Sequence, residues 1–124
     1  MKSIFLSALT ALTISLAAAT PSTAQQNTTG WLPHHDYQYF FDEGFYQPLV
    51  PIQVDAAVIN GQVHYHATFG PAPGGVNNWA THHGMSDSAF VQRNLFYQNQ
   101  GYYLRQQSRV VHAGQAYNQG VWYR

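Results

Sequence analysis

The sequence predicts a small α+β protein, built as two tandem helix-plus-β-hairpin repeats packed into one domain. Two observations predict this class. Trp31-Leu32-Pro33-His34-His35 returns as Trp79-Ala80-Thr81-His82-His83, and each copy is followed by an aromatic stretch that closes on Gly44-Phe45-Tyr46 or Gly101-Tyr102-Tyr103. Trp31 and Trp79 are 48 residues apart, and Trp122 follows 43 residues after Trp79. Such a period is typical of repeat proteins, in which each unit buries a face against its neighbour. We expect the three tryptophans to be matching core anchors.

Residues 1–24 are predicted to be a secretory signal peptide. Lys2 supplies a positive start, Ile4 to Ala19 an apolar run, and Ser22-Thr23-Ala24 a small-residue cleavage site. The run is diluted by serine and threonine and is shorter than the roughly 20 residues that span a membrane. We therefore expect a secreted, extracellular protein. A flexible leader is expected at 25–30, with a glycosylation sequon at Asn27, and one domain at 31–124, divided into repeats 31–78 and 79–124.

The first repeat predicts a short helix and a hairpin. Because His35 and Gly44 are only nine residues apart, residues 36–43 can form about two helical turns at most. Residues 45–59 are predicted to be extended, with Pro48 and Pro51 favouring an edge or a bend. Asn60-Gly61, between two β-branched stretches, predicts a tight hairpin turn, and the Gly/Pro-rich residues 70–75 predict the linker between the repeats.

The second repeat predicts a longer helix and a second hairpin. Ser86 is a good N-cap, Asp87 suits the first turn, and Gly101 is a plausible stop, so residues 87–99 are predicted to be helical. The apolar residues of this helix fall on two faces, one with Phe90 and one with Val91, so we expect it to be covered on more than one side. Residues 102–111 predict a strand, 112–115 a turn, and the following residues a last strand that ends at Trp122.

Charge and cysteine content exclude several classes of partner and of stabilisation. Residues 25–124 contain four arginines, no lysine and five acidic residues, so the positive surface that nucleic acid or an anionic membrane requires is missing. We expect neither as a partner. No disulfide can staple the domain because the chain has no cysteine. Low charge with many Gln, Asn and Tyr favours an extracellular protein or a glycan as partner.

The residue types of catalysis form no recognisable pattern. Asp42 and Glu43 are adjacent, so on a helix they diverge by about 100° instead of facing each other across a cleft. The chain has no Gly-x-Ser-x-Gly elbow, and Ser86 is explained as a helix cap. We therefore predict a protein that is not an enzyme and needs no cofactor.

Histidines and tyrosines offer two alternative functions. His64 and His66 lie two apart on a predicted strand, on the same side, and could bind copper or zinc if further ligands joined them. The paired histidines instead return at the same place in both repeats, which favours a structural role for them. A metal-binding secreted protein is thus one alternative. A carbohydrate-binding module that uses exposed Tyr and Trp side chains is the other.

The second repeat carries a family resemblance. Trp79-x-x-His82-His83-Gly84-Met85-Ser86, an aromatic helix, Gly101-Tyr102, a strand and a closing segment from Tyr117 to Trp122 together resemble the polyglycine hydrolase-like structural repeat, also called the bacterial tandem repeat. The resemblance spans Trp31 to Trp122 and has fewer motif residues in the first repeat. It implies structural roles for the motif residues, which are Trp31, His34, His35, Gly44, Trp79, His82, His83, Gly84, Met85, Ser86, Gly101 and Trp122.

The resemblance also implies a function. In the family these repeats form the non-catalytic N-terminal part of secreted proteins, beside a separate serine peptidase domain. Residues 25–124 cannot supply that peptidase's Ser-x-x-Lys nucleophile because they contain no lysine. We therefore expect a non-catalytic extracellular binding or recognition module. If the shortened first helix leaves an apolar patch uncovered, a homodimer is predicted.

Overall fold

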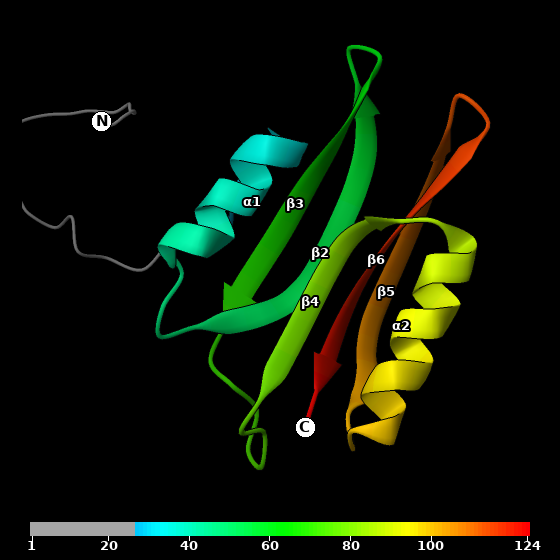
Figure 1. The fold of residues 1–124 in the computed structure, drawn as a ribbon. Coiled ribbons are helices and arrows are strands. Elements are labelled where there is room, and N and C mark those ends of the chain that lie inside the picture. The colour runs from blue at the N-terminus through cyan, green and yellow to red at the C-terminus, as the bar shows by residue number, and fades with distance from the viewer. Residues whose placement is uncertain (1–26) are drawn as a thin grey trace, which may run out of the picture.

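The computed structural model describes residues 27–124 and has a mixed α+β fold (Figure 1). The signal peptide predicted at residues 1–24 lies outside the described residues. The elements in chain order are β1 (Leu32–Pro33), α1 (His34–Glu43), β2 (Val50–Ile59), β3 (Gln62–Gly70), β4 (Trp79–Met85), α2 (Asp87–Asn99), β5 (Tyr103–His112) and β6 (Gln115–Tyr123). The predicted α+β class is confirmed.

The strands form two antiparallel three-stranded sheets. The first sheet has the order β1-β3-β2 and the second the order β4-β6-β5. In each sheet the strand that comes last in the chain, β3 or β6, is therefore the central one. Figure 1 shows α1 beside β3 at the left of the molecule and α2 beside β5 at the right. The side chains of β6 alternate between two environments: Val121 and Tyr123 join the core with the first sheet, whereas Trp122 packs under α2. The second sheet is therefore covered on both faces.

Both hairpin predictions are confirmed. Asn60 (φ 52°) and Gly61 (φ 75°) form the turn between β2 and β3, and Ala113 (φ 51°) and Gly114 (φ 77°) form the turn between β5 and β6. Two consecutive residues with positive φ suit a type I′ turn, whose twist matches that of the flanking strands. Ala113 occupies such a position without the help of glycine.

The second helix agrees with its prediction at both ends. The Ser86 hydroxyl accepts a hydrogen bond of 3.1 Å from the Ala89 N–H, as expected of an N-cap. Gly101 follows the helix with φ 87°, and the Tyr102 N–H closes the last turn on the Tyr97 carbonyl. A polar cap and a glycine stop were thus sufficient to place this helix.

The first helix is longer than predicted. It begins at His34, not Asp36, and has ten residues, so the limit of two turns was wrong. Pro33 precedes it with φ −67° and no side-chain cap, and Gly44 ends it with φ 71°. The prediction placed the helix start after His35 by comparison with His82-His83 of the second repeat. The helix instead starts directly after Pro33, which has no N–H that would need a partner there. His34 and His35 consequently lie in a helix, whereas His82 and His83 lie in strand β4.

The segment between α1 and the hairpin is extended only in its second part. Residues 45–49 form turns and the strand begins at Val50, so the predicted extended stretch from 45 is wrong at its start. Pro51 lies inside β2 and is buried, beside a shift of register between Pro51 and Gln53. An edge strand tolerates this proline because no ladder bond is needed on its outer side.

Part of the expected leader runs along the first sheet. The Thr29 N–H bonds to the Ala67 carbonyl (3.1 Å), and the Phe69 N–H bonds to the Asn27 carbonyl (2.8 Å). These bonds extend the β1 side of the sheet beyond Leu32. From Asn27 onward, the described chain is therefore attached to β3.

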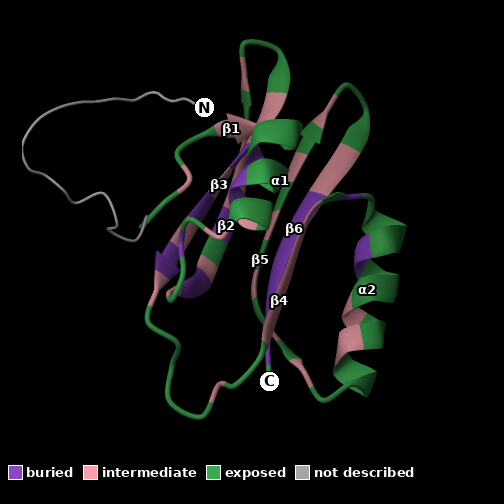
Figure 2. Cartoon of the chain, turned by 60° about the vertical axis from the view of Figure 1, so that its left-hand side comes forward, coloured by how far each residue is buried: buried purple, intermediate pink, exposed green. Residues whose placement is uncertain are grey.

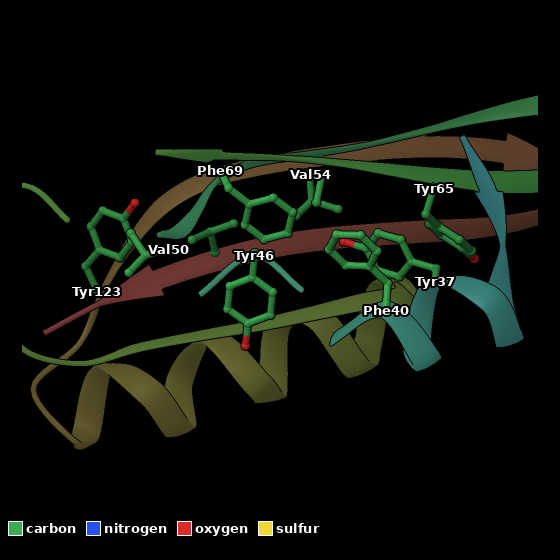
Figure 3. Packing of buried hydrophobic residues seen from close by; sticks show 10 residues of the cluster. Tyr37, Phe40, Tyr46, Val50, Val54, Tyr65, Phe69 and Tyr123 are labelled. Carbon is green, nitrogen blue, oxygen red and sulfur yellow. The ribbon is translucent and has the colours of Figure 1, made fainter. Parts of the chain in front are cut away.

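The core is aromatic and has two parts. The larger cluster fills the space between α1 and the two sheets, and Figure 2 shows its buried residues on β3, β2 and β6. Tyr46 and Phe69 stack at its centre with ring centroids 4.8 Å apart (Figure 3). The smaller cluster joins Met85, Phe90 and Trp122 between α2 and the second sheet. Such aromatic contacts supply the apolar area that a small domain without disulfides requires.

Only one of the three tryptophans is a fully buried anchor. Trp122 has no exposed surface, Trp79 is half-buried against the larger cluster, and Trp31 is 44% exposed. The expectation of three matching core anchors was therefore wrong for Trp31. In the described chain no sheet or helix covers the face of the first sheet on which Trp31 and His66 lie.

Candidate functional site

His83 lies at the junction of the two halves. Its ring touches those of Tyr37 (4.6 Å between centroids) and Tyr65 (4.7 Å), and its Nε2 is 2.8 Å from Nδ1 of His34. Burial, and then the proximity of His34 and His82, lower the pKa of His83 to about 4. At neutral pH this imidazole is uncharged and joins α1, β3 and β4 by packing.

His82 points to the other face of the second sheet. Its Nε2 lies 2.7 Å from the Tyr97 hydroxyl, and its ring meets the edge of Trp122. Burial and the nearby Arg93 guanidinium lower the pKa of His82 to about 4. Consecutive histidines of one strand thus serve two different cores, as the alternation of side chains along a strand requires.

Gly84 lies near the end of β4, where the register with β6 shifts between His82 and Met85. Its φ is 69°, and a Cβ there would fall 2.9 Å from the Tyr65 hydroxyl. Its N–H donates to Oε1 of the buried Gln119 (2.8 Å). Met85 then enters the smaller core cluster and Ser86 caps α2. Successive residues from His82 to Ser86 therefore have different structural roles: the histidines and Met85 pack, Gly84 has a positive φ, and Ser86 caps the helix.

The two candidate metal ligands lie on the open face of the first sheet. His64 and His66 flank the buried Tyr65, so their side chains leave β3 on the face opposite the core. The Nδ1 atom of His64 is 2.9 Å from the Gln62 carbonyl, and the His66 ring lies 5.0 Å from that of Trp31. Among residues 27–124, no group of three or more His, Cys, Asp or Glu side chains could hold a metal ion. Metal binding by this pair stays a prediction.

Two polar networks were not anticipated from the sequence. Arg109 donates from Nε and Nη2 to both oxygens of Asp87 (2.9 and 2.8 Å), and the buried Asn118 donates to Asp87 (2.7 Å) and to the Met85 carbonyl (3.1 Å). These bonds hold the pKa of Asp87 far below its ordinary value, the Arg109 bond contributing most. They fix the start of α2 on β5 and β6. No local sequence signal links residues so far apart in the chain.

The second network joins the two sheets. The Gln106 amide donates to the Val54 carbonyl (3.3 Å) and accepts from the Val54 N–H (2.9 Å), and the Ser108 hydroxyl donates to the same carbonyl (2.7 Å). Val54 is fully buried and lies in β2, the edge of the first sheet. Side chains of β5 thus make the hydrogen bonds to the Val54 main chain that a neighbouring strand would otherwise make.

Apolar side chains are exposed along one side of α2. Phe90 and Tyr97 pack on Trp122, but Val91 and Leu95 remain 56% and 55% exposed, so the expected cover on more than one side was wrong. Val91 and Leu95, one helical turn apart, form the α2 ridge. Phe96, 53% exposed, lies on another side of the helix beside an open hollow lined by Ala89, Gln92 and Arg93.

Exposed tyrosines are few. Tyr39 on α1 lies against Phe45, and Tyr103 on β5 lies near Tyr123; both are 54% exposed. The other seven tyrosines are buried or half-buried. A row of stacking platforms for sugar rings would need several exposed aromatics on one surface, and these two lie on different elements.

Neither helix of the described chain has the length and apolar character needed to cross a membrane.

The comparisons with known proteins give one match. Residues 76–124 match a family model described as polyglycine hydrolase-like, structural repeat. The comparison with curated proteins found no match, and neither did the comparison with solved structures. The matched segment contains β4, α2, β5 and β6, so it covers a complete sheet with its helix. Residues 76–124, the second sheet with its helix, are therefore similar to the polyglycine hydrolase-like structural repeat.

Proposed function

We propose that this protein is a secreted, non-catalytic repeat module that binds another protein through the α2 ridge. The observation that carries the proposal is the exposure of Val91 and Leu95, each more than half exposed, on a firmly held helix. Asn94 of this helix accepts a 2.9 Å hydrogen bond from Nε1 of the buried Trp122, and Ser86 and Asp87 fix the helix start. A rigid helix with apolar side chains one turn apart is a common means of protein recognition.

The repeat part of the proposal extends the family match to the first half of the chain. Both halves have the element order strand, helix, strand, strand, and both sheets place the last strand in the middle. Leu32 pairs with Tyr65 in β1–β3, and Ala80 pairs with Trp122 in β4–β6. Tyr65 and Trp122 then pack against the helix of their own half. These agreements support two copies of one unit, the first with a shorter helix.

The chemistry of the described residues favours binding over catalysis. His82 and His83 have lowered pKa values and aromatic neighbours, so at neutral pH they are uncharged packing groups. Asp87 is bound on both oxygens by Arg109. The matched family is itself a structural repeat. A protein partner is favoured over a glycan because the exposed side chains of the α2 ridge are aliphatic.

Photocrosslinking tests the proposed surface. A photoreactive phenylalanine derivative is placed at position 95 or, as a control of similar exposure on α1, at position 39. The purified protein is irradiated with the extracellular proteins of its source organism. We expect a protein adduct, sensitive to protease, from position 95 and not from position 39. Equal labelling at both positions, or retention of the protein on insoluble polysaccharide without any adduct, would refute the protein-binding role.

Secretion has a separate test. Protein recovered from the culture medium should begin at Gln25 when its N-terminal residues are sequenced, because the predicted cleavage site precedes that residue. Recovery of the intact chain from the cells, with none in the medium, would reject secretion and leave the binding role to be judged by crosslinking.

A further inference from the structure

Strand β4 is an edge of the second sheet, and it lies between the two helices. Because the strand order is β4-β6-β5, β4 pairs only with β6 in the described chain. Figures 1 and 2 both show β4 between α1 and α2, and in Figure 2 no helix passes in front of it. An edge strand presents main-chain N–H and C=O groups to which another extended chain can bond. The outer edge of β4 is therefore a candidate binding surface.

The strand register shows which main-chain groups of β4 face outward. Asn78 and Arg124 exchange two main-chain hydrogen bonds of 2.9 Å, so they form a hydrogen-bonded pair of the antiparallel ladder. Hydrogen-bonded and non-hydrogen-bonded pairs alternate along such a ladder, and the register is unbroken through Thr81. Trp79 and Thr81 therefore direct their N–H and C=O groups away from β6. Among residues 27–124, no main-chain group elsewhere in the fold bonds to them.

The other three edges differ from that of β4. β1 has only two residues, and the main chain of β2 is bonded at Val54 by the side chain of Gln106. β5 carries Arg105 and Arg109, and its register with β6 shifts beside Arg105. Charged side chains and such irregularities are means by which proteins keep edge strands from pairing. β4 contains no Asp, Glu, Lys or Arg, and its register shifts only after His82.

The α2 side of the β4 edge offers a charged group and an aromatic ring to a bound chain. Arg93 is exposed and lies next to β4, with its Nη1 atom 3.4 Å from Nε2 of His82. No carboxylate of the described residues forms an ion pair with it. Phe96, also exposed, lines the same open hollow as Arg93. Because side chains alternate between the two faces of a sheet, every second residue of a strand added to β4 lies on this side.

We infer that the β4 edge binds an extended segment of a partner protein, which adds a fourth strand to the second sheet and places an acidic side chain beside Arg93. The main-chain groups of Trp79 and Thr81 hold the segment whatever its sequence is. Arg93 and Phe96 select among segments by charge and by apolar contact. Strand addition of this kind is a recurring mode of peptide recognition.

This surface is separate from the α2 ridge. Val91 and Leu95 lie one and two turns after Asp87, which is bonded to Arg109 of β5, so the ridge lies on the β5 side of the helix. Arg93 lies on the β4 side, as its contact with His82 shows. The inference therefore does not depend on the proposed function, and each surface can be tested without disturbing the other.

The test compares two substitutions at one position of the β4 edge. Thr81→Pro removes the outward N–H and leaves the ladder bonds to β6, which the neighbouring residues make, so this variant should fold. Thr81→Val is the matched control: like proline, valine loses the side-chain hydrogen bond to the Gly120 carbonyl (2.8 Å), but it keeps the N–H. Circular dichroism and thermal melts verify the fold of both. The probe is a phage-displayed library of random linear peptides, selected on the purified mature protein.

We expect the selected peptides to be rich in acidic residues and to bind Thr81→Val as they bind the wild type. Thr81→Pro should bind them roughly tenfold more weakly or worse, because a main-chain hydrogen bond is lost. Arg93→Glu should prefer the same peptides with the acidic residue replaced by lysine. Leu95→Glu, on the ridge, should bind as the wild type does. In NMR hydrogen exchange, the bound peptide should slow the amides of Trp79 and Thr81.

Three results would overturn the inference. One is that no selected peptide distinguishes Thr81→Pro from Thr81→Val. Another is that bound peptides leave the exchange of the Trp79 and Thr81 amides unchanged, a measurement on the wild type that decides the matter even if Thr81→Pro does not fold. The third is self-association of the wild type in light scattering that Thr81→Pro abolishes, because a second copy would then occupy the edge. Adducts from position 95 would uphold the proposed function in each case.

Discussion

The indole ring of Trp122 lies directly over Gly120 on the same face of strand β6. A Cβ built on Gly120 would fall 2.6 Å from Cη2 of the ring, closer than carbon atoms approach each other. The ring is fully buried between this glycine and α2, and its Nε1 donates to Asn94. The glycine thus leaves the space that the ring of the smaller core cluster occupies.

Replacing Gly120 with alanine should destabilise the protein by about 1–3 kcal/mol, because the Trp122 ring must shift within a packed core. Urea unfolding followed by tryptophan fluorescence measures the change. Gly74→Ala is the control, since no atom lies within 4 Å of a Cβ at that position and the linker is exposed. Equal stability of the two variants would show that the ring does not depend on Gly120.

Stability should fall as the pH falls from about 6.5 towards 4. The pKa of His83 is lowered to about 4 in the folded protein, so between these values the unfolded chain binds more protons than the folded one. The free energy of unfolding then decreases by up to about 1.4 kcal/mol per pH unit for this residue. His82 adds to the trend by less than its pKa alone suggests, because solvent reaches part of its ring.

His83→Gln should flatten this pH dependence, since glutamine does not titrate. The measurement is the free energy of unfolding from urea titrations at several pH values between 4.5 and 7. His35→Gln, at an exposed position of α1, serves as the control and should keep the wild-type slope. An unchanged slope in His83→Gln would mean that this imidazole is not kept neutral by its surroundings.

Gln106→Ala should destabilise the protein by about 1–3 kcal/mol, because it removes the amide acceptor of the buried Val54 N–H. Hydrogen exchange of the Val54 amide, followed by NMR, should accelerate more in this variant than the loss of global stability explains. Gln92→Ala, on the exposed surface of α2, provides the comparison. If Val54 exchanges no faster than in Gln92→Ala, the Gln106 amide does not protect the strand.

Copper or zinc should shift the melting temperature little. His64 and His66 offer two imidazoles, whereas a tight zinc site has at least three protein ligands, and a ligand stabilises the folded state only in proportion to its affinity. Thermal melts of the wild type and of the His64→Ala, His66→Ala double variant, each with and without metal, make the comparison. A large shift in the wild type that disappears in the double variant would establish the metal-binding alternative.

Elements with local signals could be predicted from the sequence. The cap at Ser86, the stop at Gly101 and the Asn60-Gly61 turn are each encoded within a few residues, and all three are found as expected. The start of α1 was missed because the prediction placed it after His34-His35 by comparison with His82-His83, whereas the first pair lies in the helix and the second in a strand. The different burial of Trp31 and Trp79 was missed because it depends on which neighbour each sheet has, a long-range property that two similar pentapeptides do not encode.

The same limit applies to the candidate site. The α2 ridge is visible in the sequence as apolar residues, but their exposure follows from the absence of a covering element in the described chain, not from their own pattern. The Asp87–Arg109 pair and the Gln106–Val54 bonds join residues 22 and 52 apart in sequence, so no local rule could have paired them.

The bonds between Gln106 and Val54 also bear on aggregation. An edge strand with free N–H and C=O groups is a template on which another chain can add a strand, and many proteins protect such edges with charged residues. Here the neutral side-chain amide of Gln106 is hydrogen-bonded to the N–H and C=O groups of Val54, which lies buried in the middle of β2. The N–H and C=O groups of Val54 are therefore not free to pair with a strand of another chain, and a neutral internal side chain, not a charged one, protects this point of the edge.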